Sequence, residues 1–126
     1  MLLNNELILS EKMNNNLHEI QLKRFQLLQH LYDATGGDSS VMVSLWELGE
    51  ELGFTKSETN TIDNFLSEEG LLEHVTFGGN ISITHAGIIA VETALTQPDK
   101  PTDYFPPVNF IQVGTMIGSQ IQQGTQ

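Results

Sequence analysis

The chain has 126 residues, of which 16 are acidic and 5 are basic, so its formal net charge is −11. This length suits one domain with modest tails. An acidic surplus of this size repels phosphate backbones and anionic lipid surfaces, which weighs against nucleic-acid and membrane partners. The lack of cysteine excludes disulfides and thiolate chemistry, and together with the lack of a recognisable signal or membrane-spanning run it predicts a cytoplasmic protein.

Residues 1–16 are predicted to be an N-terminal extension. Its apolar residues suit a short helix, but the run Asn14–Asn16 should interrupt it, because asparagine side chains compete for backbone hydrogen bonds. A strong helix is predicted from Leu17 to Ala34, ended by two glycines. We expect its basic pair, Lys23 and Arg24, on the outer face, with Glu19 as the partner of Lys23.

Two capping boxes follow a short strand predicted at 41–43. Ser44 and Glu47 have the spacing that opens a helix, and Thr55 and Glu58 repeat it eleven residues later. Gly53 separates the two predicted helices, as expected for a helix-stopping glycine.

A hairpin and a closing helix come next. Residues 71–77 and 81–83 are predicted strands, joined by a turn of Gly78, Gly79 and Asn80, whose residue types tolerate positive φ. Thr84 should cap the last helix. The predicted core is formed by Ile20, Phe25, Leu28, Leu31, Leu48, Leu52, Ile62, Phe65, Leu66, Leu72, Ile83, Ile88 and Val91.

The composition changes after residue 95. Four prolines within ten residues predict an extended linker at 96–107, and the uncharged, Gly- and Gln-rich residues 108–126 form a tail. The single Trp46 is expected to pack between elements rather than to serve as a binding hot spot.

The order of these elements resembles the winged helix-turn-helix superfamily over residues 17–95. The stretch LWELGEELGFTKSETNTIDNFLSEEGLLEHV looks like its helix-turn-helix and first wing strand, and GGNISITHAGIIAVETAL looks like its wing tip, second strand and closing helix. The resemblance implies a mainly α fold with a small β-hairpin: a three-helix core, a wing and an extra C-terminal helix. It says less about function than about fold.

In that superfamily the helix that begins after Thr55 would enter the DNA major groove, and the wing tip Gly78–Asn80 would touch the backbone. The outward, base-reading positions would be Lys56, Ser57, Thr59, Asn60, Asp63, Asn64 and Ser67. The charge pattern departs from this use. Glu58, Asp63 and Glu68 should spread around the helix and bring a carboxylate near phosphate, and Lys56 is its sole base.

Nothing in the sequence points to catalysis. The four histidines are far apart, and the nearest approach to a metal site, His74 with His85 beside Glu73 or Glu92, is better explained as surface residues. We therefore predict a non-enzymatic protein without cofactor or metal.

Two functions remain, and the charge decides their order. The preferred prediction is a regulatory module that acts through protein–protein interaction or oligomerisation, with an unknown protein partner. The alternative is a DNA-binding transcriptional regulator of the same fold. Apolar residues outside the domain also predict a homodimer.

Overall fold

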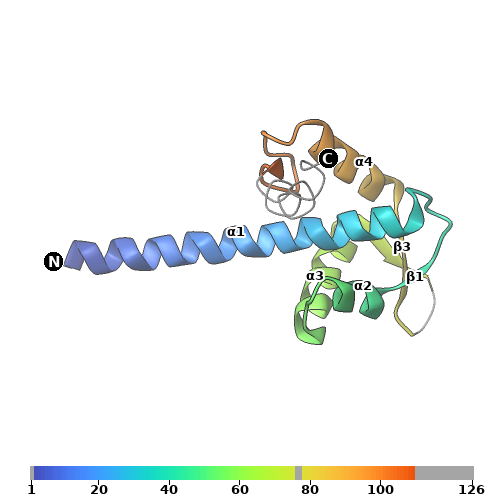
Figure 1. The fold of residues 1–126 in the computed structure, drawn as a ribbon, viewed down its shortest axis with the longest axis horizontal. Helices are drawn as coiled ribbons and strands as arrows, with labels where there is room; N and C mark the ends of the chain where they lie inside the picture. Colours follow the sequence, from blue (N-terminus) through green and yellow to red (C-terminus); the bar gives the residue numbers. More distant parts are fainter. Residues whose placement is uncertain (1, 76–77, 110–126) are drawn as a thin grey trace, which may run out of the picture.

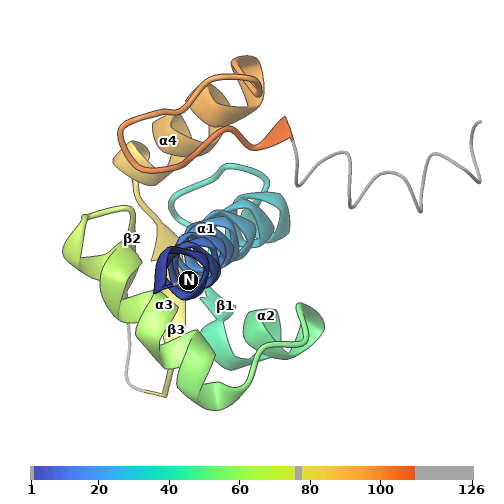
Figure 2. The ribbon, with the colours of Figure 1, turned by 90° about the vertical axis from the view of Figure 1, so that its left-hand side faces the viewer.

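The computed structural model describes residues 2–75 and 78–109, with side chains from residue 16 onward. Within that part a long helix runs through the middle of the molecule, with α4 on one side and α2 and α3 on the other (Figures 1 and 2). The elements are α1 (Leu2–Thr35), β1 (Val43–Ser44), α2 (Leu45–Glu51), α3 (Lys56–Glu68), β2 (Leu72–His74), β3 (Asn80–Ile83) and α4 (His85–Thr96). No helix among these residues is long and apolar enough to cross a membrane.

Helix α1 is continuous through Asn14–Asn16, so the predicted interruption is wrong. Each asparagine costs less than about 0.7 kcal/mol of helix propensity relative to alanine. That cost is small once a helix is nucleated, and the packed half of α1 provides the nucleus. The sequence of α1 contains neither glycine nor proline, the residues that break helices most strongly.

The predicted N-caps are present, and of the two predicted capping boxes the one at Thr55 is complete. The Thr55 hydroxyl accepts from the Glu58 amide at 3.0 Å, and the Glu58 carboxylate accepts from the Thr55 amide at 3.0 Å, which completes a capping box. Ser44 accepts from the Glu47 amide at 3.3 Å, the first of the two bonds of such a box. Thr84 caps α4 through the Gly87 amide at 3.0 Å.

The three strands form one antiparallel sheet in the order β1-β3-β2. Val43 pairs with Ile81 on one side of β3, and Leu72 pairs with Ile83 on the other. Strand β1 therefore begins at the end of the predicted 41–43 strand and includes Ser44. Helix, short strand, two helices, hairpin and closing helix make a winged-helix fold, and the predicted fold class is confirmed.

The core lies between α1, the sheet and the other helices. Most predicted core residues are buried, but Leu52, Phe65 and Ile88 are only partly so. Ile20 is 45% exposed, so its assignment to the core is wrong. The predicted core list left out several buried side chains: Leu27, Leu45, Leu71, Ile81, Phe105 and Val108.

Residues 97–109, here called the strap, cross back over α1 and are not a free linker. Phe105 is 2% exposed, and its ring meets that of Phe25 edge-on, with centroids 5.1 Å apart. Val108 is 1% exposed. The Phe105 amide donates to the Thr102 hydroxyl at 3.1 Å, which holds the turn that inserts the ring. The domain core thus extends to residue 108, and the predicted tail from residue 110 on lies outside the described residues.

Candidate nucleic-acid interface

The crossing of α2 and α3 is built on a close contact between Gly49 and Thr59. A Cβ atom on Gly49 would stand only 2.8 Å from Thr59 Cγ2, so glycine is required for this approach. Thr59 is 1% exposed, and its hydroxyl donates to the Thr55 carbonyl at 2.8 Å. The prediction that Thr59 faces outward to read bases is therefore wrong. Its β-branched side chain packs the two helices together.

Asp63 is also turned inward, contrary to its predicted outward position. It is 2% exposed, and both carboxylate oxygens lie 2.9 Å from His74 Nε2 on the wing strand β2. Burial raises the pKa of the Asp63 carboxyl, and the nearby His74 offsets part of that rise. The pair joins α3 to the wing, which an analysis of helix spacing alone does not reveal.

Glu58, the first acidic residue of α3, is neutralised by Lys23 of α1. Its carboxylate lies 2.6 Å from Lys23 Nζ, and this hydrogen bond holds the Glu58 pKa below its ordinary value and raises that of Lys23. The expected partner of Lys23 was Glu19, one turn away, and the structure instead places its hydrogen bond across to α3. Arg24 stacks over the Phe65 ring at 3.7 Å from its centroid. The basic pair therefore anchors α1 to α3.

The exposed face of α3 is left almost without carboxylates. Lys56, Ser57, Asn60 and Asn64 are exposed as predicted, and Ser67 is partly exposed. Thr61, which was not predicted, joins them. At about 100° per residue these positions span an arc of roughly 140°, and Glu68 is the acidic residue within it. The face thus offers two amides, several hydroxyls and one cation.

The wing tip is held against α2. Gly78 and Gly79 have φ values of +91° and +87°, in the left-handed region that favours glycine. The Gly79 carbonyl accepts from the Leu45 amide at 2.9 Å, and a Cβ atom there would lie 2.6 Å from Trp46 Nε1. Trp46 of α2 thus lies against Gly79 of the wing tip, a contact between elements as expected, although its side chain is 37% exposed.

The sequence analysis placed Asn80 in the turn, and this is wrong. Asn80 is the first residue of β3. It pairs with Ser44 of β1, and its carbonyl accepts from the Val75 amide at 3.1 Å. The described part of the wing carries no lysine or arginine, so it offers no charged contact to a phosphate backbone.

Two of the histidines, His30 and His74, are engaged in separate contacts. His30 on α1 lies 2.7 Å from Glu51 on α2, while His74 pairs with Asp63. Among the described residues, no group of three or more His, Cys, Asp or Glu side chains is placed to hold a metal ion.

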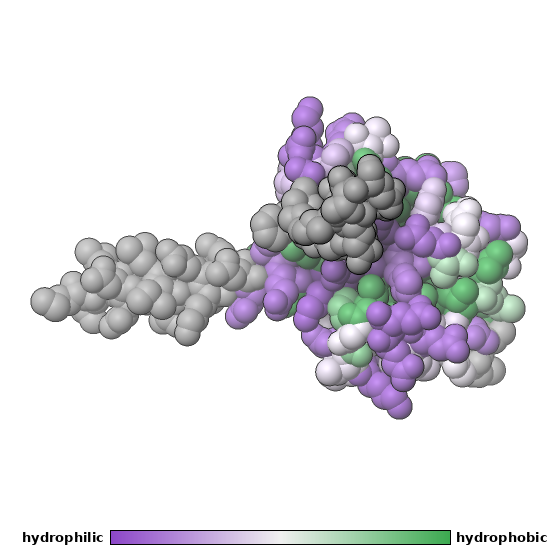
Figure 3. Space-filling view, in the orientation of Figure 1, coloured by the Kyte–Doolittle hydropathy of each residue, from purple (hydrophilic) through white to green (hydrophobic). Residues whose placement is uncertain are grey.

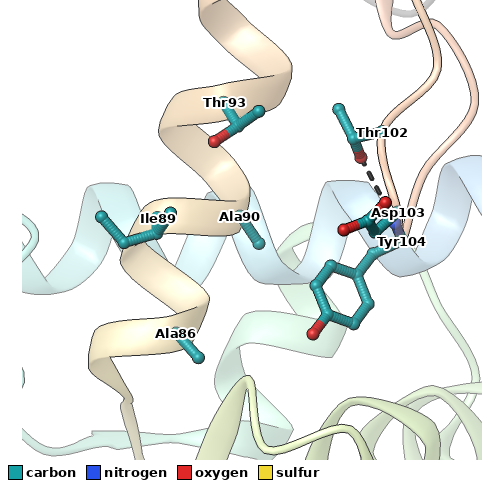
Figure 4. Close-up of a pocket in the computed structure, with 7 residues that line it drawn as sticks. All are labelled: Ala86, Ile89, Ala90, Thr93, Thr102, Asp103 and Tyr104. Atoms are coloured by element: carbon teal, nitrogen blue, oxygen red, sulfur yellow. Dashed lines mark hydrogen bonds between the residues drawn. The ribbon is translucent and has the colours of Figure 1, made fainter.

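A shallow hollow of about 280 Å³ lies between α4 and the strap (Figure 4). Its α4 side consists of small or aliphatic residues, and the Thr102 hydroxyl on its far side accepts from the Tyr104 amide at 3.4 Å. This polar contact serves the turn of the strap, so the hollow follows from how the strap packs. The residues that line it from α4 are Ala86, Ile89, Ala90 and Thr93.

A comparison of the sequence with protein families gives no match, and a comparison with curated proteins gives none either. Among solved structures, the chain is similar to Lactococcus lactis ZitR, a mutant in apo form, with 15% identity and a TM-score of 0.43 over 99% of this chain and 96% of that one. At these values the similarity does not bear on function, and the fold assignment rests on the element order and sheet topology described above.

Proposed function

We propose that this winged-helix protein is a DNA-binding regulator that places the exposed face of α3 in the major groove. The observation that carries the proposal is the withdrawal of Glu58 and Asp63 from that face, one to Lys23 and the other to His74. The sequence-based preference for a protein partner rested in part on carboxylates around α3. With two of the three engaged elsewhere, the DNA-binding alternative becomes the better supported function.

The chemistry of the exposed face suits base reading. Asn60 and Asn64 are one helical turn apart, and an asparagine amide can pair with the N6 and N7 edge of adenine. Ser57 and Ser67 supply hydroxyls that can bond to either bases or phosphate oxygens. Lys56 stands at the start of α3, where it can reach a flanking phosphate.

The small number of cations on this face predicts a weak dependence of DNA affinity on salt. Each phosphate neutralised by a cation contributes about 0.9 to the slope of log K against log salt. Lys56 is the one cation that α3 offers, and Lys23 and Arg24 are already engaged with Glu58 and Phe65. Affinity should therefore be modest, and its slope shallow, with about one such contact per domain.

The test begins with selection of bound sequences from a random duplex pool, followed by fluorescence anisotropy on an enriched and a random duplex. We expect the enriched duplex to be preferred, and Asn64→Ala to lose about 1–3 kcal/mol of that preference. Asn109→Ala, which removes an exposed amide from the strap, is the matched control and should bind normally. No enrichment, together with no binding even at low salt, would refute DNA binding.

One observation favours the second candidate, a module acting through association. The face of the domain seen in Figure 3 is mostly hydrophilic, with hydrophobic side chains in small separate groups. Yet on α1 the apolar Leu17 and Ile20 are 53% and 45% exposed. This exposed apolar pair favours contact with a second chain.

A further inference from the structure

The first half of α1 extends well beyond the domain, with no other described element beside it (Figure 1). Leu17 and Ile20 lie where the helix leaves the domain, and both are largely exposed. From Phe25 onward one face of the same helix is buried in the core. We propose that the projecting half of α1 pairs antiparallel with the same segment of a second copy of this chain.

The sequence of the projecting half carries a coiled-coil seam. Positions separated alternately by four and three residues fall on one side of a helix and form the a and d positions of heptads. Four of the six such positions are apolar, and two are polar. They are Leu2, Glu6, Leu9, Met13, Asn16 and Ile20. Continued, the series passes Lys23, which is paired with Glu58, and then Leu27, which is buried in its own domain, so the seam ends where α1 enters the fold.

The order of residues along the seam selects the antiparallel direction. With two copies running in opposite directions about the midpoint of the seam, the position of Leu2 faces that of Ile20, and Leu9 faces Met13. The same alignment sets Glu6 opposite Asn16, whose amide can donate to the carboxylate. In a parallel pair, by contrast, the two Glu6 carboxylates would face each other and repel.

Apolar residues beside the seam also match in the antiparallel alignment. Leu3 and Leu17 occupy the same side of the heptad repeat, and the antiparallel alignment brings the position of each beside the other in the second copy. Leu17, 53% exposed in the single chain, would then be covered. Ile8 falls at a c position, about 130° around the helix from the centre of the seam, and so lies outside the proposed contact.

A groove at the base of the projecting half extends the proposed contact onto the domain. It has a volume of about 460 Å³ and lies between α1 and α3, with Asn16, Ile20 and Ile62 among its lining residues. Asn16 and Ile20 are also seam positions. The seam spans about 27 Å from Leu2 to Ile20, so the N-terminal end of one copy would reach this groove on the other. An antiparallel pair also keeps the two domains at opposite ends, where they do not collide.

Sedimentation of the full chain tests the association. We expect twice the monomer mass at tens of micromolar, and expect Leu9→Asp to raise the dissociation constant by at least about a hundredfold, because each dimer would bury two unpaired carboxylates. Ile8→Asp introduces the same carboxylate at the adjacent position and should leave the dimer mass measured by sedimentation unchanged. A monomeric wild-type chain, or a dimer unaffected by Leu9→Asp, would overturn the proposal.

Disulfide trapping tests the direction, and it is clean because the chain has no cysteine of its own. A Glu6→Cys chain is mixed with a tagged Asn16→Cys chain and oxidised. Antiparallel pairing predicts mainly the mixed disulfide, identified by the tag. A product dominated by crosslinks between two Glu6→Cys chains would refute it in favour of a parallel dimer. Neither experiment depends on DNA binding, so the two proposals can fail separately.

Discussion

Removal of the Phe105 ring tests whether the strap is part of the folded core. Phe105 is 2% exposed and meets Phe25 edge-on. Truncating a buried phenylalanine to alanine costs about 3–5 kcal/mol, which includes the cavity that it leaves. The aromatic pair is worth about 0.5–1.5 kcal/mol beyond its buried area. We therefore expect Phe105→Ala to cost about 4 kcal/mol, a large fraction of the 5–15 kcal/mol typical of a domain.

Urea unfolding followed by the fluorescence of Trp46, the single tryptophan, measures this cost. The midpoint of thermal unfolding should also fall, by roughly 10–20 °C. Asp103→Ala, an exposed change two residues away, is the matched control and should stay within about 0.5 kcal/mol of the wild type. If Phe105→Ala unfolds at the same urea concentration as this control, the strap contributes nothing to the core and its assignment is wrong.

Two other contacts give further predictions. Gly49→Ala should destabilise the domain by about 1–3 kcal/mol, because the new methyl group meets Thr59. A double-mutant cycle tests this cause: the cost of Gly49→Ala should be smaller in a Thr59→Ala background. Equal costs in the two backgrounds would exclude the clash as the cause. Burial raises the folded-state pKa of Asp63 above its unfolded value of about 3.9, so its contribution to stability is full below that pH and is lost as the pH rises through the folded pKa. The difference in unfolding free energy between wild type and Asp63→Asn should therefore decline from pH 3.5 upward, and a difference that rises instead would contradict this argument.

The local signals in the sequence predicted the fold well. The capping residues Thr55 and Thr84 and the glycine wing each act through neighbouring backbone, which a sequence shows directly. The wrong prediction of a free linker at residues 96–107 has a different origin. Proline content predicted a linker, but the ring of Phe105 is buried by its contact with Phe25, eighty residues earlier. A composition shift cannot report a contact between segments so far apart in the chain.

The candidate site was harder to predict because a helix face depends on what packs against it. Spacing placed Thr59 and Asp63 on α3 without knowing that α2 approaches at Gly49 or that the wing brings in His74. Charge counting had the same limit. It treated Glu58 as a free carboxylate, although Lys23 from α1 neutralises it. The outward positions of Asn60 and Asn64 were predicted correctly, since both residues are exposed and helix spacing alone places them.

A single unbroken helix shared between core and solvent has a consequence for hydrogen exchange. The amides of α1 around Leu28 and Leu31 lie where the helix meets α2, α3, α4 and the sheet, so they should exchange only when the whole domain unfolds. The amides of residues 2–15, in the same helix, have no such neighbours among the described elements of one chain and should exchange through local fraying. One helix would then show two exchange regimes. Any protection of residues 2–15 should grow with protein concentration, while that of the amides around Leu28 and Leu31 stays constant.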